Sequence, residues 1–412
     1  MTLQAAEDTA FSEAPAEPRE KPIGISAGMT FLMAAAAGLI CANIYYAQPL
    51  AGPIAASIGL PAEATGLIVT LTQIGYGLGL LFIVPLGDLV ENRRLIITML
   101  AIVTLALLAA AISSTPSPFL AASLMIGLGS VAVQMIVPFA ASLAPEESRG
   151  RVVGNVVSGL MLGIMLARPV SSFIAEFSSW HTVFYVSAAV MVVLGFVLAI
   201  KLPTRRPETS LNYLSLLGSM ASLVVSQPVL RRRAAYQFGQ FASFSLFWTV
   251  TPLLLAGPAF GLSQAGIALF ALAGVAGAIA SPIAGRLADR DLSRPATAIG
   301  IAALVVGYLI THIAPEGSIL ALGLLTLAAI LIDFGVSTTL VISQRAIYGL
   351  DASLRSRLNG LFMAAFFVGG ALGSAIGAWA YATGGWSLAS SIGIALPIAA
   401  FLYFLTERRR AA

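Results

Sequence analysis

The chain has 412 residues, of which 58% are hydrophobic and only 10% are charged. Soluble domains carry about 25% charged residues, so this composition excludes an ordinary soluble domain and indicates a membrane protein with many spans. The formal net charge of +4 does not by itself indicate a nucleic-acid partner, and one cysteine and two histidines are too few for us to expect a metal site or a cofactor.

In chain order, a tail comes first and a series of apolar segments follows. Residues 1–25 are acidic, Pro-rich and without periodicity, which predicts a disordered cytoplasmic tail rather than a signal peptide. A helix needs about 20 apolar residues to cross the hydrocarbon of a bilayer. On this criterion we predict twelve transmembrane helices, over residues 26–49, 63–86, 93–113, 117–143, 148–177, 181–200, 234–257, 263–284, 295–313, 317–343, 356–383 and 386–406.

The basic residues are distributed unequally between the two sides of these spans. All of the 22 Lys and Arg residues except Arg168 fall in the two tails or in the loops after even-numbered spans. Lys and Arg are retained on the cytoplasmic side of membranes. We therefore expect both termini in the cytoplasm, and the positive net charge needs no nucleic-acid partner.

The two halves of the chain repeat. The stretch "RGRVVG" at 149–154 resembles "RSRLNG" at 355–360, an offset of 206 that also relates Gly163 to Gly369 and Gly129 to Gly335. A parallel repeat of six spans predicts an all-α membrane protein built as two six-helix bundles around a central cavity. The predicted segments are a bundle over 26–200, a cytoplasmic linker over 201–233, a bundle over 234–406 and a short tail over 407–412.

Within the linker, leucines and a methionine recur at three-residue steps at Leu211, Leu214, Leu217 and Met220. This spacing is close to that of a helix and favours an amphipathic helix on the cytoplasmic face. The alternative is a loosely ordered connector.

The loop after the second span carries a family signature. It reads "GDLVENRR" from Gly87 to Arg94 and resembles the Gly-x-x-x-Asp-Arg-x-Gly-Arg-Arg motif of the major facilitator superfamily, in a shorter form with Glu91 at the aspartate position. The stretch "NIYYAQPL" at 43–50 resembles the bacterial drug, sugar and nucleoside efflux carriers of that superfamily. The resemblance implies a bacterial inner-membrane carrier that takes a small-molecule substrate through alternating access.

The resemblance also implies a latch that closes the cytoplasmic side in one state and opens in the other. In this interpretation the glycines allow tight turns and the charged groups pair or cap helices. The alternative is a solvated charge cluster that only fixes topology. The latch residues would be Gly87, Asp88, Glu91, Arg93 and Arg94 in the first copy, and Gly285, Asp289 and Arg290 in the second.

The fifth span resembles the Gly-x-x-x-Gly-Pro-x-x-Gly-Gly pattern of superfamily antiporters only in part. Gly159 and Gly163 match, whereas Ile164 stands at the proline position and Arg168 at that of the last glycine. Glycines four residues apart let helices approach closely.

The sequence does not favour an enzyme. Neither of its two lysines, Lys21 and Lys201, stands in a phosphate-binding Gly-Lys-[Ser/Thr] motif, and the zinc-protease and nucleophile-elbow motifs do not occur. This leaves transport driven by a gradient. Intramembrane ionisable groups are costly and usually functional, and near the middle of the spans only Arg168 and Asp333 qualify.

Neither charge has a counterpart at the offset of 206, which suggests a task in the cavity rather than in the scaffold. We hypothesise that Arg168 and Asp333 pair with each other, or alternate between pairing and binding substrate or a proton. The alternative is a purely structural pair, or an arginine bonded to helix carbonyls.

Buried amides, phenols and an indole could orient a polar ligand in the cavity, or could serve only as contacts between helices. Tyr45 is predicted to face lipid, because it points about 100° away from Tyr46 on a helix. The predicted cavity residues are Asn43, Tyr46, Gln48, Gln73, Tyr76, Gln134, Gln240 and Trp248.

Together these features predict a carrier that exports a small organic compound by proton antiport. We expect it to function as a monomer in membrane lipid, without nucleic acid. One alternative is uptake or facilitated diffusion of a small organic anion bound by Arg168. An alternative of another class is a membrane sensor that does not transport.

Overall fold

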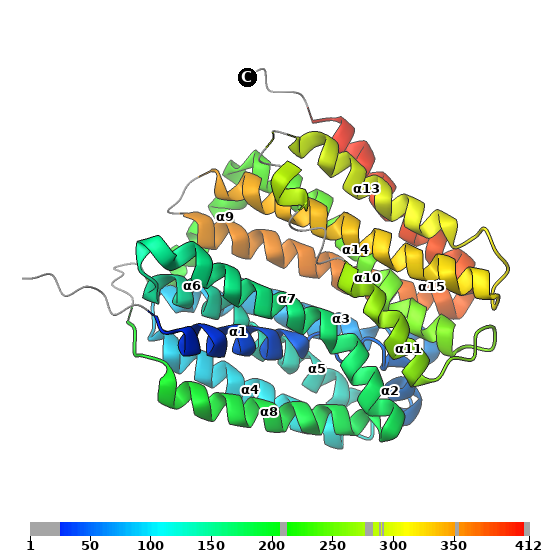
Figure 1. The fold of residues 1–412 in the computed structure, drawn as a ribbon, viewed down its shortest axis with the longest axis horizontal. Helices are drawn as coiled ribbons and strands as arrows, with labels where there is room; N and C mark the ends of the chain where they lie inside the picture. Colours follow the sequence, from blue (N-terminus) through cyan, green and yellow to red (C-terminus); the bar gives the residue numbers. More distant parts are fainter. Residues whose placement is uncertain are drawn as a thin grey trace, which may run out of the picture.

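The computed structural model describes residues 25–206, 212–276, 283–287, 290, 292–350 and 354–407, and all regular elements within these ranges are helical. Figure 1 shows two groups of long helices, one with α1, α4 and α8 and the other with α13, α14 and α15. The predicted N-terminal tail before Ile25, Leu211, Asp289 and the C-terminal tail after residue 407 lie outside the described residues.

We call residues 27–201 the first half and residues 228–405 the second half. The elements of the first half are α1 Ala27–Ala42, α2 Ala51–Ile58, η1 Ala62–Ala64, α3 Leu67–Phe82, η2 Val84–Asp88, α4 Asn92–Ile112, α5 Pro116–Ser130, α6 Val133–Leu143, α7 Glu146–Phe177 and α8 Trp180–Lys201. The linker holds α9 Tyr213–Ser226. The described elements of the second half are α10 Pro228–Ala256, α11 Gln264–Ala271, η3 Leu272–Ala276, α13 Ser293–Ile310, α14 Ile319–Tyr348 and α15 Arg355–Leu405.

These elements make twelve membrane spans, as predicted. Nine described helical segments are long and apolar enough to cross a membrane. One of them, α15, counts twice because the chain turns back at Gly384 and Gly385, where Gly385 has a φ of 62° that favours glycine. Of the other two spans, span 1 is interrupted and span 8 is described only in part. Span 1 consists of α1 and α2, and span 8 begins with α11 and η3.

The sequence repeat is also a structural repeat. Span 1 packs on span 5 through α1 and α7, and span 7 packs on span 11 through α10 and α15. A side chain at Gly163 would overlap the backbone of Gly38, and one at Gly369 would overlap the backbone of Phe238. The two glycines therefore allow the same close approach of two helices in each half.

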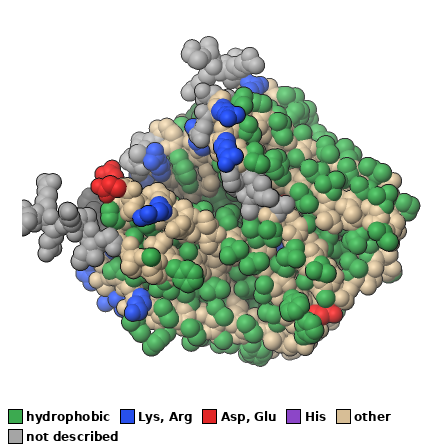
Figure 2. Space-filling model, in the orientation of Figure 1, with side chains coloured by type: hydrophobic (Ala, Val, Ile, Leu, Met, Phe, Trp, Pro, Cys, Tyr) green, Lys and Arg blue, Asp and Glu red, His purple; other side chains and the backbone are tan. Residues whose placement is uncertain are grey.

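The charges gather at one end of the molecule. Figure 2 shows Lys and Arg side chains mainly at the left and upper left, where α6 and α9 lie in Figure 1, whereas hydrophobic side chains cover most of the remaining face. We call this the basic end. The opposite end, which holds α2 and the turn at Gly385, is called the α2 end.

Helix α9 has a different apolar face from the predicted one. Its buried residues are Leu216, Met220 and Leu223, which follow helical steps of four and three residues, whereas Leu214 is 78% exposed. The first residue of α9 is Tyr213, and its hydroxyl donates a hydrogen bond of 2.8 Å to the Phe82 carbonyl at the end of α3. The linker helix therefore contacts the first half directly.

Candidate substrate and coupling site

Helix α7 brings one arginine into the interior of the protein. Arg168 is only 3% exposed. It precedes Pro169, which lies inside the helix and cannot donate a backbone hydrogen bond to the preceding turn. A buried guanidinium is costly unless polar or aromatic groups surround it, and both halves of the protein supply such groups.

From the first half, the interruption of span 1 supplies an amide and a phenol. Residues 43–50 form turns in which backbone N–H groups bond carbonyls three residues back, as Tyr45 does to Ala42. Here Gln48 Oε1 accepts a hydrogen bond of 2.7 Å from Arg168 Nε, and the Tyr45 ring centre lies 5.1 Å from the guanidinium carbon. The prediction that Tyr45 faces lipid is wrong, because this residue is 6% exposed and belongs to the site.

From the second half, α10 supplies two aromatic rings. The guanidinium carbon of Arg168 lies 4.4 Å from the ring centre of Trp248 and 5.4 Å from that of Phe244. Cation–π contacts of this kind are worth about 2 kcal/mol or more when desolvated. Arg168 therefore joins the two halves through ring faces.

The acid of the site is bonded to the same indole. Asp333 is the fifteenth of thirty residues in α14 and is 7% exposed. Its Oδ2 accepts a hydrogen bond of 2.9 Å from Trp248 Nε1. Within the described residues, ion pairs closer than 4.0 Å join only Arg94 to Glu91 and Arg233 to Glu407. The hypothesised direct pair of Arg168 and Asp333 is thus replaced by an indirect one, with Trp248 between the charges.

The site keeps unused hydrogen-bonding capacity. Arg168 Nη2 is buried and has no hydrogen-bond partner among the described residues. A buried donor without a partner loses about 1–3 kcal/mol of solvation, so Nη2 is suited to an oxygen atom from a ligand or from water.

The remaining predicted cavity residues divide into two groups. Asn43 and Tyr46 share one partner in α8. Asn43 Oδ1 accepts a hydrogen bond of 2.5 Å from Ser187, and Tyr46 interacts with the same serine. Gln240 accepts a bond of 2.8 Å from Thr339 of α14. These contacts join helices within one half.

The second group lies closer to the boundary between the halves. Gln73 of α3 donates a bond of 3.0 Å to Ser245 of α10, in the other half. Tyr76 accepts a bond of 2.7 Å from Gln134, and its ring centre lies 4.4 Å from that of Phe367 in α15. Gln73 and Tyr76 therefore line the seam between α3 and the second half.

The loop after span 2 connects three parts of the chain. Arg93 donates to the Leu202 carbonyl at 3.2 Å and to that of Ala199 at the end of α8. Glu91 pairs with the exposed Arg94 at 3.1 Å. Asp88 interacts electrostatically with Arg357, at the start of α15 in the second half.

The glycines of this motif do not have the role that we expected. A Cβ at Gly87 would lie 3.6 Å or more from its neighbours, and one at Gly285 would meet no atom of the described residues within 4 Å. Neither glycine has a positive φ. The structure therefore gives no steric reason for glycine at either position. Arg290, also of the second copy, is exposed.

At the α2 end the two halves touch through polar and small groups. Glu176 Oε2, in the last turn of α7, accepts a hydrogen bond of 2.9 Å from the Ala265 N–H in the first turn of α11. A side chain at Gly66 would overlap the Ser374 carbonyl of α15. A carboxylate at a helix N-terminus interacts favourably with the helix dipole, so Glu176 stabilises the contact between α7 and α11 at this end.

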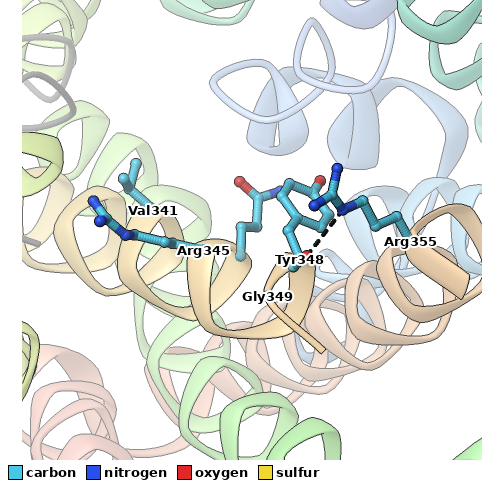
Figure 3. Close-up of a pocket in the computed structure, with 6 residues that line it drawn as sticks. Val341, Arg345, Tyr348, Gly349 and Arg355 are labelled. Atoms are coloured by element: carbon cyan, nitrogen blue, oxygen red, sulfur yellow. Dashed lines mark hydrogen bonds between the residues drawn. The ribbon is translucent and has the colours of Figure 1, made fainter. Parts of the chain in front are cut away.

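A separate pocket of about 440 Å³ lies at the basic end (Figure 3). Its lining includes Val341, Tyr348 and Arg355, and Arg355 Nε donates to the Tyr348 carbonyl at 2.9 Å. Tyr348 follows Asp333 by fifteen residues, or about 22 Å along a helix. The pocket is therefore distinct from the site around Arg168.

Comparisons with known proteins agree with this architecture. The profile of the Major Facilitator Superfamily matches residues 30–349 and 234–412. The transporter YgaY of Escherichia coli O157:H7 is 40% identical over 363 residues, which cover 88% of this chain and 91% of YgaY. The transporter SCO4007 of Streptomyces coelicolor is 32% identical over 383 residues, which cover 92% of this chain and 87% of SCO4007.

Among solved structures, a point mutant of the nucleoside transporter NupG superposes with a TM-score of 0.73 at 14% identity, covering 91% of this chain and 99% of NupG. At that identity the likeness concerns the fold. The family profile and the sequence relatives show the family itself, and the all-helical fold with two repeated halves agrees with them. This chain therefore belongs to the major facilitator superfamily, as a multi-pass membrane transporter of a small molecule and not an enzyme.

Proposed function

We propose that this transporter exports a small organic compound from the bacterial cytoplasm in exchange for protons. The observation that carries the proposal is the arrangement of Arg168, Trp248 and Asp333. One buried cation and one buried acid, from different halves, contact the same indole. Proton binding to Asp333 would change the charge of a site that both halves share.

The orientation follows from the distribution of charge. The basic end carries the loops rich in Lys and Arg, which favours a cytoplasmic location for it and for both termini. On this orientation, the contact of Glu176 with Ala265 closes the periplasmic side. The inner opening would then be controlled by the loop after span 2, where Asp88 interacts with Arg357 across the halves.

Exchange requires that substrate and proton exclude each other. An ionised Asp333 would leave the site neutral with Arg168, whereas a protonated Asp333 would leave a net positive charge. A substrate that prefers the neutral site would thus be released when a proton binds from the periplasm. Such coupling is reciprocal, because the substrate must then lower the affinity for the proton by the same factor.

A second candidate is uptake or facilitated diffusion of a small organic anion. The observation that favours it is the buried and unpartnered Nη2 of Arg168. An anionic oxygen would satisfy this donor, and guanidinium–carboxylate bonds are among the stronger hydrogen bonds in proteins. A protonated Asp333 would promote anion binding, so proton and substrate would travel together.

Inverted membrane vesicles with an acidic interior distinguish the candidates. Drugs, sugars, nucleosides and carboxylates are added one by one while a dye reports the pH gradient, and nucleosides are included because NupG transports them. Under proton antiport, a substrate dissipates the gradient in wild-type vesicles but not with Asp333→Asn. Dissipation that persists at the wild-type rate in Asp333→Asn would refute Asp333 as the proton site. Substrate uptake is measured in parallel. Uptake that deepens the gradient, or that leaves it unchanged, favours the anion carrier, and no uptake of any compound favours the sensor.

A further inference from the structure

The indole of Trp248 lies between two opposite charges that do not touch. Its Nε1–H donates to Asp333 Oδ2 at 2.9 Å, and its face lies 4.4 Å from the guanidinium carbon of Arg168. Trp248 is 1% exposed. The rings of Phe247 and Phe270 pack against it with centre distances of 5.8 and 5.9 Å. The indole therefore holds Arg168 and Asp333 in fixed positions relative to each other.

The backbone of η3, in span 8, also packs against the indole and the guanidinium. A Cβ at Gly274 would lie 3.2 Å from Cζ2 of Trp248 and 3.6 Å from Nη1 of Arg168. The first distance is tighter than ordinary packing, so a Cβ at this position would require the indole to shift by a few tenths of an ångström. Gly274 lies in η3, which also contacts α7. The indole, the guanidinium and η3 thus form one packed unit across the two halves.

We propose that Trp248 is the positioning residue that couples protonation of Asp333 to the contact between the halves. This inference rests on the proposed proton site at Asp333. A hydrogen bond to a carboxylate is roughly twice as strong as one to a neutral acceptor, so protonation weakens the hold on Nε1. Bonded groups also polarise one another. An indole that donates to a carboxylate has a more negative face and attracts Arg168 more strongly.

Protonation of Asp333 therefore weakens two contacts that the Trp248 indole makes. The first is the bond of Trp248 to α14 within the second half, and the second is the contact of Trp248 with Arg168 in the first half. The other titratable groups that interact with this unit are Tyr45, and Cys41 next to it. Both are uncharged near neutral pH. The charge of the unit therefore changes at Asp333 when the pH falls from neutral.

The test uses protons as the probe and requires no substrate. Purified full-length protein carries spin labels at Phe177→Cys of α7 and Leu269→Cys of α11, which are 75% and 71% exposed, in a Cys41→Ala background. Distances between the labels are measured by pulsed electron paramagnetic resonance in nanodiscs as the pH is lowered. We expect the distance distribution to shift with pH in this parent protein.

Two substitutions separate the indole N–H from a general loss of packing. Trp248→Phe keeps a ring beneath Arg168 but removes the bond to Asp333, and we expect the pH-dependent shift to be lost. Trp386→Phe is the matched control. It removes another buried indole N–H of the same half, which bonds Thr311 at 3.0 Å and neither of the two charges, while the ring that packs on Phe247 is kept. Its shift should equal that of the parent.

The outcomes distinguish this inference from the proposed function. A parental shift in Trp248→Phe, together with a lost shift in Asp333→Asn, overturns the role of Trp248 and retains the proton site. A parental shift in Asp333→Asn, or no shift in the parent, overturns both. Should Trp248→Phe fail to fold, Gly274→Ala supplies the test, because its Cβ crowds the same indole. An undiminished shift in Gly274→Ala would then refute the coupling role.

Discussion

Replacing Gly38 by alanine is expected to separate α1 from α7. The new Cβ would lie 2.5 Å from the Gly159 carbonyl oxygen, whereas ordinary contacts begin at 3.4 Å, so the two backbones must separate by about 0.9 Å, the difference between these values. Overpacking of this kind costs about 1–3 kcal/mol. The separation also affects the site, because α1 leads into the segment that holds Gln48 and α7 carries Arg168. If fully transmitted, it lengthens their 2.7 Å hydrogen bond to about 3.6 Å, which is no longer a hydrogen bond.

Thermal unfolding in detergent tests this prediction, with Gly28→Ala as the control. Gly28 lies on the same helix, and its Cβ would have only one neighbour, at 3.9 Å. We expect a lower midpoint of unfolding for Gly38→Ala and no decrease for Gly28→Ala, since alanine is the better helix former. An unchanged midpoint in Gly38→Ala would mean that the close contact of α1 and α7 does not limit stability.

Three further substitutions test individual contacts. Arg168→Lys keeps the charge but loses the hydrogen bond from Nε to Gln48 Oε1. The loss of about 1.5–3 kcal/mol should slow transport in vesicles about 10- to 100-fold. A wild-type rate would contradict the need for the planar guanidinium. Glu176→Gln removes a charge whose interaction with the N-terminus of α11 is worth about 0.3–1 kcal/mol. Spin labels on α7 and α11 should therefore report longer distances in a larger share of the molecules. An unchanged distance distribution would show that the charge of Glu176 does not hold these helices together. Asp88→Asn weakens the attraction to Arg357 by about 0.2–1 kcal/mol. Distances between spin labels on the basic ends of α3 and α15 should therefore increase. Distances between labels at the α2 end should stay the same.

The number of spans and the internal repeat could be predicted from the sequence because they depend on local properties. Apolar length identifies a span, and the offset of 206 relates residues such as Gly163 and Gly369 without any knowledge of their contacts. The same local signals identified Arg168 and Asp333 as charges without a scaffold counterpart. Their relation to each other depends on packing between distant helices, which no local pattern contains.

Tyr45 shows why the surroundings of Arg168 could not be predicted. Its expected direction assumed a continuous helix, whereas the chain forms turns from residue 43 to residue 50 and brings Tyr45 and Gln48 to the same guanidinium. Pro49 was the available signal, because proline interrupts helices. Phe244 and Gly274 gave no signal, since an aromatic residue and a glycine in an apolar run are ordinary components of a membrane helix.

The glycine contacts between helices have a consequence for sequence divergence. Gly163 approaches the backbone of Gly38, and Gly369 approaches that of Phe238, so the partner atoms are ones that every amino acid possesses. The side chains around these contacts can therefore change while the spacing of the helices is retained. Backbone contacts of this kind are compatible with a fold that is shared with a nucleoside transporter at only 14% identity. On the proposed function, a relative of this chain could accept a new cargo by exchanging the residues around the proposed site at Arg168, without rebuilding either bundle.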